Sequence, residues 1–183
     1  YREMTAACLA GDKLMAIAQL RPGFEAEYQG RPPVRSIAGL GKIIAHRENP
    51  DGTFNILLEG IARVRILQEL PPDHSYREVR AQLVCDRIID GFDQQAARDT
   101  LRLLIDKLSQ FVGESGSSLR SLFSETKRLP CLVDVLSSAL IQKPTLRRKL
   151  FESRDLAARV ELLTVSIEQL VAGLNNTGQS ELN

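Results

Sequence analysis

Hydrophobic and polar residues alternate most regularly on either side of a turn at residues 49–52, Asn-Pro-Asp-Gly. Proline fixes φ, aspartate can bond its own backbone and glycine accepts positive φ, so this sequence predicts a tight turn. After the turn, Phe54, Ile56 and Leu58 fall on one side of an extended chain and the residues between them on the other. That period of two is typical of a strand with one buried face, and the stretch 39–66 therefore predicts a β-hairpin.

Gly60 interrupts the second strand of this hairpin. Beyond it, Ala62, Val64 and Ile66 are apolar and alternate with arginines. We expect a bulge or a tight bend at Gly60, which redirects the strand without exchanging its two faces. Such a strand is typical of a curved or barrel-like sheet.

The arginines in this alternation are Arg63 and Arg65. We expect them to face solvent or to pair with a carboxylate across the sheet, such as that of Glu59 or Glu78. A cross-strand pair of this kind contributes only about 0.2–1 kcal/mol. We therefore interpret the two arginines as part of the solvent face of the sheet and not as a binding site.

Apolar runs of strand length also occur before and after the hairpin. The expected strands are residues 13–20, 34–46, 53–59, 61–70 and 76–85. Residues 1–10 predict a short helix that ends at Gly11 and buries Met4, Cys8 and Leu9.

The hydrophobic period changes from two to about 3.6 past Gly91, which marks the expected boundary between two subdomains. Helices are expected after a cap at Asp93, from Pro130, over residues 145–152 and after a cap at Asp155. Gly173 can close the last helix, which leaves residues 175–183 as a polar tail. Residues 113–118, Gly-Glu-Ser-Gly-Ser-Ser, are expected to form a flexible linker.

The fold class that follows from these patterns is α+β. We expect an amino-terminal curled mixed β-sheet pseudobarrel with a short helix over residues 1–91. A carboxy-terminal helical bundle is expected over residues 92–183.

The composition fits a globular protein. The chain of 183 residues is 43% hydrophobic and 26% charged, which is enough for a sizeable core, and no apolar run has the length needed to cross a bilayer. Lys and Arg number 24 against 23 Asp and Glu, so the net charge of +1 gives no long-range attraction to nucleic acid or to an anionic surface. We expect a cytoplasmic protein that has neither a membrane nor a nucleic acid as its partner.

The residues that could bind a metal are scattered along the chain. Cys8, Cys85 and Cys131 form no Cys-x-x-Cys pair, and their odd number argues against a disulfide framework. His46 and His74 lie on separate predicted turns. We therefore expect no metal site and three reduced thiols.

Motifs of catalysis and of cofactor binding are missing as well. The Gly41-Lys42 pair lacks the spacing of a nucleotide-binding loop, and no Gly-x-Ser-x-Gly elbow occurs. Residues 73–75, Asp-His-Ser, are adjacent and cannot bond in series as a catalytic triad, so they are interpreted as turn formers. We expect neither catalytic residues nor a bound cofactor.

The hairpin also carries a resemblance to a known family. The Asp-Gly-Thr turn, the Ile-Leu-Leu-Glu-Gly after it and the later Arg63 and Ile66 resemble the signature of the amino-terminal, substrate-binding domain of ATP-dependent Lon proteases. Residues 1–4, Tyr-Arg-Glu-Met, resemble the helix before that signature, and Tyr76 with Arg77 the strand after it. In the helical half, the residues at matching places are Asp134, Leu150, Glu152, Arg159 and Leu162.

The resemblance covers nearly the whole chain and implies a PUA-like fold that recognises polypeptide substrates. The serine and lysine that cut peptide bonds in Lon proteases lie in a separate domain, so the resemblance implies a module without enzymatic activity. Two features depart from the family: its usual strand-rich segment does not precede Tyr1, and Arg148-Lys149 replaces its Lys-Gln pair. We interpret the chain as a free-standing member of the family.

The candidate binding residues lie on a predicted loop and on the last strand. We expect a loop over residues 21–33, rich in Pro and Gly, to carry Phe24 and Tyr28. These rings and Tyr76 would line an apolar patch or groove between barrel and bundle, where an unfolded polypeptide or a partner protein is held by side-chain burial and an open strand edge. In the alternative interpretation, the two loop rings only fold back over one end of the barrel.

Two other functions stay open as alternatives. One is an amino-terminal fragment of a complete Lon protease, whose gene would continue past Asn183 into a long helix and a Walker loop. The other is an RNA-binding or small-molecule-binding PUA-like barrel, for which the basic residues 147–149 are the main indication. A solvated helix face explains that basic run more simply. The sequence does not predict an oligomeric state.

Overall fold

The computed structural model describes residues 1–28 and 30–180, with the side chains of all of these except 26, 27 and 176–180. The chain is divided into two compact units, Tyr1–Cys85 and Asp86–Asn183. The first unit contains the sheet and the second contains helices α2 to α6. The expected α+β fold class is therefore confirmed.

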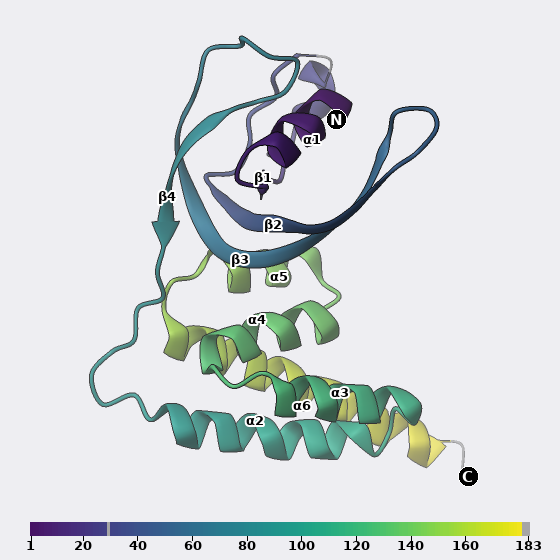
Figure 1. Cartoon of the computed structure of the whole chain (residues 1–183). Helices are drawn as coiled ribbons and strands as arrows, with labels where there is room; N and C mark the ends of the chain where they lie inside the picture. The colour runs from purple at the N-terminus through teal and green to yellow at the C-terminus, as the bar shows by residue number, and fades with distance from the viewer. Residues whose placement is uncertain (29, 181–183) are drawn as a thin grey trace. The chain divides into compact units, whose positions relative to one another are not determined.

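The amino-terminal unit is one antiparallel sheet with a helix in its curve. The helix α1 spans Arg2–Ala10, and the strands are β1 (Leu14–Ile17), β2 (Ile37–Glu48), β3 (Phe54–Glu69) and β4 (Val79–Val84), in the spatial order β1-β2-β3-β4. Figure 1 shows the long strands β2 and β3 bending around α1. All the strand pairs are antiparallel, so the expected mixed sheet is wrong in this respect. The reason is that each strand is followed in space by its own neighbour in sequence, without a crossover.

The helix α1 and the turn of the β2–β3 hairpin form where the sequence predicts them. The backbone N–H of Gly11 ends α1 by bonding the Ala7 carbonyl at 3.1 Å. At the hairpin turn, Asp51 Oδ1 accepts a hydrogen bond from the Thr53 N–H at 3.0 Å, and Gly52 has a φ of 76°. These are the local roles that glycine and aspartate residues have in caps and turns.

A bulge lies at Gly60, as the sequence predicts. Gly60 is opposite Gly41, and the next pair joins Ala62 to Leu40, so that Ile61 is an extra residue in β3. A second irregularity between Ile43 and Ala45 belongs to β2. Extra residues of this kind bend a strand and increase its twist, which accounts for the curvature of the sheet.

The extra residue exchanges the faces of β3, contrary to our expectation. Before the bulge Leu58 lies opposite Ile43, and after it Arg63 lies opposite Gly39. Ile43 and Gly39 are an even number of residues apart on β2, and opposed residues share a face, so Arg63 lies on the face of Leu58. Arg63 is accordingly buried, with 7% of its surface exposed, whereas Arg65 is exposed. Arg65, two residues further along β3, lies on the same face but is exposed, so the expected solvent exposure is confirmed for Arg65 and wrong for Arg63.

Over its described residues, 86–180, the carboxy-terminal unit contains five helices. These are α2 (Gln94–Ser109), α3 (Glu114–Glu125), α4 (Leu129–Leu140), α5 (Pro144–Glu152) and α6 (Leu156–Ser180). The expected caps are confirmed: Asp93 Oδ1 accepts from the N–H of Ala96 at 2.9 Å, and Asp155 Oδ1 accepts from that of Ala158 at 3.1 Å. Pro130 lies in the first turn of α4.

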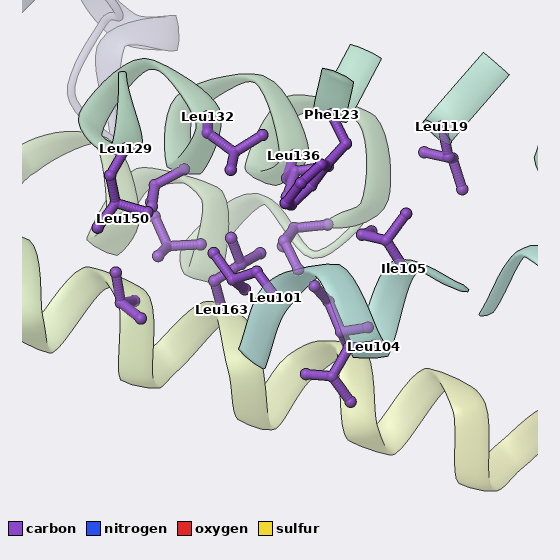
Figure 2. Close-up of a cluster of buried hydrophobic side chains, with 14 of the residues drawn as sticks. Leu101, Leu104, Ile105, Leu119, Phe123, Leu129, Leu132, Leu136, Leu150 and Leu163 are labelled. Atoms are coloured by element: carbon purple, nitrogen blue, oxygen red, sulfur yellow. The ribbon is translucent and has the colours of Figure 1, made fainter. Parts of the chain in front are cut away.

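The core of this unit is a cluster of aliphatic side chains from all its helices. Figure 2 shows Leu101 of α2, Leu136 of α4 and Leu163 of α6 pointing into this cluster. Each of the three is fully buried. Side chains at helical spacing on several amphipathic helices therefore produce the bundle, as their period predicts.

Two expectations about the helical unit are wrong. Residues 113–118 do not form a linker, because α3 begins at Glu114. Gly116 lets α3 approach α2: a Cβ at this position would lie 2.5 Å from the carbonyl oxygen of Ser109, whose Oγ donates to the Gly116 carbonyl at 3.1 Å. The second error concerns Gly173, which lies inside α6 and does not end it.

An arginine is buried among the helices. Arg159 of α6 has 1% of its surface exposed and donates from Nη1 to Asp86 Oδ1 at 2.7 Å. Its Nη2 donates to Asp134 of α4. A buried guanidinium needs such carboxylates because its desolvation is costly. The start of the unit, α4 and α6 are thus joined at one charged group.

Candidate functional site

The loop between β1 and β2 places two aromatic rings side by side. Pro22 and Gly23 form its first turn, in which Gly23 has φ 85° and ψ 10°, close to the third position of a type II turn. The turn leads into the short 3-10 helix η1 (Phe24–Glu27), which is followed by Tyr28. One helical turn separates the two aromatic residues, and their ring centroids are 5.9 Å apart at an interplanar angle of 50°.

The base of this loop is closed by its own backbone. The N–H of Arg21 donates to the Pro33 carbonyl at 2.9 Å, and the N–H of Arg35 donates to the Gln19 carbonyl at 2.8 Å. The Arg21 Nε adds a bond to the Val34 carbonyl at 3.1 Å. Compact loops whose ends are joined in this way present their tips on a fixed base.

The two rings of the loop differ in exposure. Tyr28 is 62% exposed, whereas Phe24 is half-buried. The alternative in which both rings fold back over the barrel does not describe Tyr28. Contiguous exposed apolar surface is what marks a contact site, and here the exposed ring of Tyr28 is continuous with the ring of Phe24.

Arg77 ties the end of this loop to the connection between β3 and β4. Its Nε donates to Glu69 Oε2 at 3.0 Å and its Nη2 to Glu69 Oε1 at 2.6 Å, while Nη1 donates to the Pro32 carbonyl at 2.7 Å. The forked pair with a carboxylate is the strong geometry of an arginine. The sequence did not predict this role for Arg77. The only indication in the sequence is that an acidic residue, Glu69, and a basic residue, Arg77, lie on the two sides of the turn at residues 71–74.

Tyr76 lies in a different environment from the two loop rings. It stacks on His74, with ring centroids 5.1 Å apart and an interplanar angle of 6°. Desolvation, followed by the charges of Glu78 and Glu3, raises the pKa of the Tyr76 hydroxyl. In the described part of the chain, no ring contact joins Tyr76 to Phe24 or Tyr28.

The β3–β4 connection is held against α1 by a cluster of charged and polar groups. His74 Nδ1 is 3.5 Å from Glu3 Oε1, and His74 Nε2 is 3.7 Å from Glu78 Oε2. The Ser75 hydroxyl donates to the same Glu3 carboxylate, and this bond lowers the pKa of Glu3. His74 and Ser75 therefore do more than form a turn, and the sequence held no signal for a contact between positions so far apart.

The remaining site expectations concern membranes, metals and the groove. No helix among residues 1–28 and 30–180 is long and apolar enough to cross a membrane. Within the same residues, no group of three or more His, Cys, Asp or Glu side chains is arranged to hold a metal ion. The expected groove between the two subdomains stays a prediction.

The sequence matches a family model described as the ATP-dependent protease La (LON) substrate-binding domain, over residues 1–169. A Lon protease of Heliobacterium modesticaldum is 25% identical over 159 residues, which are 85% of this chain and 19% of that protein. The chain thus spans less than a fifth of the length of this curated relative.

Two solved structures resemble the fold. The N-terminal domain of the Mycobacterium avium complex Lon protease superposes with a TM-score of 0.62 at 15% identity, covering 90% of this chain and 82% of that one. A Lon N-terminal domain protein from Xanthomonas campestris gives a TM-score of 0.61 at 16% identity, with the same coverage of 90% and 82%. At identities of 15% and 16%, the likeness to these structures shows the fold alone.

Proposed function

The chain belongs to the family of ATP-dependent protease La (LON) substrate-binding domains, and from that premise we propose that it holds segments of unfolded polypeptide without performing chemistry on them. The observation that carries this proposal is the exposed ring of Tyr28 beside Phe24 on a loop with a closed base. Tyr76, on the neighbouring β3–β4 connection, is the third proposed contact.

The chemistry of these residues suits chains of varied sequence. An aromatic ring has a large apolar body, and burying a side chain of this size contributes about 1.5–3 kcal/mol whatever the exact partner. The Tyr28 hydroxyl can in addition bond a backbone carbonyl of the bound segment. A pair of rings on a fixed base loses little conformational entropy on binding, which favours affinity, and their apolar contact is non-directional, which suits segments of varied sequence.

The proposal assigns no catalytic group to this chain. It applies to a free-standing module, and it applies equally to the first domain of a complete ATP-dependent protease. These two cases differ in what the gene encodes beyond this sequence, and sequencing past the codon for Asn183 distinguishes them. The proposed contacts are the same in both.

Fluorescence anisotropy with a labelled unfolded polypeptide, such as reduced and carboxymethylated lactalbumin, tests the proposal. We expect the purified chain to bind it and Phe24→Ala or Tyr28→Ala to weaken binding several-fold. Leu103→Ala is the matched control, because Leu103 is 65% exposed but lies on α2 in the other unit. Absence of binding overturns the proposed function, and equal binding by all variants removes the proposed residues.

A further inference from the structure

The outer edge of β4 is an open strand edge. β4 is the last strand in the order β1-β2-β3-β4, and Figure 1 shows it on the outside of the sheet. Arg80, Ala81, Gln82 and Leu83 are all exposed, Leu83 by 62%. Among the described residues, the backbone of Val79–Val84 bonds only toward β3. Unpaired edges of this kind accept further strands.

The direction in which the β4 backbone groups point follows from hydrogen bonds made by residues of β3 and by the residue just before β4. The N–H of Ile66 donates to the Ser36 carbonyl at 2.7 Å, so the polar groups of Ile66 point toward β2. Ile66 lies opposite Ala81, and Val64 lies opposite Leu83. In antiparallel pairs such residues turn their N–H and C=O groups away from each other, which directs those of Ala81 and Leu83 to the open edge.

A bond at the other end of β4 agrees with this direction. The carbonyl of Glu78 accepts from the N–H of Leu70, on the side of β3. Because the direction alternates along a strand, Arg80 and Gln82 also bond toward β3, and Val79, Ala81 and Leu83 offer their groups outward.

The two faces beside this edge have different chemistry. Ala81 and Leu83 share a face with Ile66 and Val64, which makes that face aliphatic. On the opposite face, Arg80 lies two residues from Gln82, and Gln82 is opposite Arg65. Both arginines are exposed, and neither makes an ion pair within the described part of the chain. An aliphatic row thus lies on one side of the open edge and two unpaired positive charges lie on the other.

We propose that an extended polypeptide segment in which aliphatic and acidic residues alternate binds antiparallel along β4 as an additional strand. The inference rests on the proposed function and specifies which segments are held and where. Main-chain bonds to Val79, Ala81 and Leu83 hold the segment. Its aliphatic side chains meet Ala81 and Leu83, and its acidic side chains meet Arg80 and Arg65. The charge complementarity selects this occupant over a basic segment.

The competing explanation is that Arg80 keeps other strands away, since charged residues often protect sheet edges. The two explanations predict opposite effects of charge. An arginine that protects the edge lowers affinity for every added strand, so its neutralisation to glutamine leaves the binding of acidic segments unchanged or improves it. An arginine that recognises an acidic side chain loses that binding on neutralisation, and its reversal to glutamate gives binding of basic segments.

Ala81→Pro is the sharpest variant for the main-chain part of the proposal. The substitution removes an N–H that points to the open edge and removes no bond to β3, so the sheet keeps its ladder. Ala81→Ser is the matched control, because it changes the side chain and keeps the N–H. Thermal unfolding of both variants should resemble that of the original chain.

The probe is a fluorescein-labelled peptide of repeating Val-Glu, titrated with the full chain and followed by anisotropy. We expect Ala81→Pro to weaken binding by about tenfold and Ala81→Ser to leave it unchanged. N-methylation of the valines, whose N–H groups face Ala81 and Leu83, should abolish binding, and N-methylation of the glutamates should not. Arg80→Gln should weaken binding of the Val-Glu peptide, and Arg80→Glu should bind a Val-Lys peptide in its place.

Unfolded lactalbumin titrated in parallel separates this inference from the proposed function. If lactalbumin binds while the Val-Glu peptide does not, or if Ala81→Pro binds the peptide as the original chain does, strand addition at β4 is overturned and the proposed function stands. If neither probe binds, both fail. Unchanged or tighter binding of Val-Glu by Arg80→Gln assigns the arginine to edge protection and overturns the acidic specificity.

Discussion

Arg77 donates two parallel hydrogen bonds to the Glu69 carboxylate, one of 3.0 Å from Nε and one of 2.6 Å from Nη2. The remaining Nη1 holds the Pro32 carbonyl at 2.7 Å, so one guanidinium fixes the β3–β4 connection and the end of the β1–β2 loop together. Both side chains are largely shielded from solvent. This shielding makes the pair more than a surface ion pair, whose contribution is typically small.

We expect Arg77→Lys to lower the free energy of unfolding by about 1–2 kcal/mol, because a lysine cannot form the fork and reach Pro32 as well. Urea unfolding followed by circular dichroism measures the change, and amide exchange at residues 32–36 reports on the loop. Arg80→Lys is the control and should change stability by less than about 0.5 kcal/mol. Equal effects of the two substitutions would show that the fork contributes nothing.

The buried Arg159 should respond much more strongly to substitution. Arg159→Met removes the buried guanidinium that donates to Asp86 and Asp134, and breaking a buried pair of this kind costs about 3–5 kcal/mol. Chemical denaturation of the whole chain, followed by the circular dichroism of its helices, measures the loss in the free energy of unfolding. The exposed Arg87, which pairs with Asp155 at 2.6 Å, is a suitable comparison. Arg87→Met should cost at most about 1 kcal/mol. Similar losses of stability in Arg159→Met and Arg87→Met would show that burial of the arginine does not decide how much its ion pairs contribute.

Two glycines of the helical unit should respond in opposite directions to alanine. In Gly116→Ala the new methyl group meets the backbone of Ser109, which forces α2 and α3 apart and costs about 1–3 kcal/mol. In Gly173→Ala the methyl group enters open space inside α6 and should stabilise the chain by about 0.5–1 kcal/mol. The midpoints of thermal unfolding measure both, and a stabilised Gly116→Ala variant would contradict the close approach.

The contact between Glu3 and the β3–β4 connection should make stability depend on pH. The hydrogen bond from Ser75 and the charge of His74 outweigh desolvation and keep the pKa of Glu3 below its usual value. A carboxyl whose pKa is lowered in the folded state stabilises the fold above its unfolded pKa, and this stabilisation is lost as pH falls through the folded pKa. We expect Glu3→Gln to be less stable at neutral pH and to approach the original chain in acid, below about pH 4.

Urea unfolding at a series of pH values from neutral to about pH 3 tests this dependence. The stability of Glu3→Gln should still fall to some extent in acid. Hydrogen bonds from Thr53 and Arg87 also lower the pKa of Asp51 and of Asp155, and these carboxyls are unchanged in the variant. Glu161→Gln, on an exposed position of α6, is the control. A constant difference between Glu3→Gln and the original chain at all pH values would argue against a role for its charge.

Local patterns in the sequence predicted the elements whose signals are local. The turn at Asp51-Gly52, the cap at Asp93 and the bulge at Gly60 each depend on residues within a few positions of one another. The start of α3 could not be found in this way. Its glycine and serines indicate a linker by composition, but Gly116 is required there by the approach of Ser109 on another helix.

The candidate site was predictable only in part for the same reason. A loop with Pro and Gly at residues 21–33 was readable, and so were its two aromatic residues. The bonds from the Ser75 hydroxyl to the Glu3 carboxylate and from Arg77 to the Pro32 carbonyl join segments that only the folded sheet brings together. The face of Arg63 was likewise decided by one extra residue in β3, whose position in the register no alternation reveals.

The closed base of the β1–β2 loop has a consequence for how far the loop can be altered. Arg21 and Pro33 are joined across the neck of the loop, so the residues between them can be exchanged or lengthened while the strands on either side keep their register. The entropy of closing such a loop rises only slowly with its length. Substitution or grafting at this tip should therefore change the proposed contacts of the loop while the sheet that carries it stays the same.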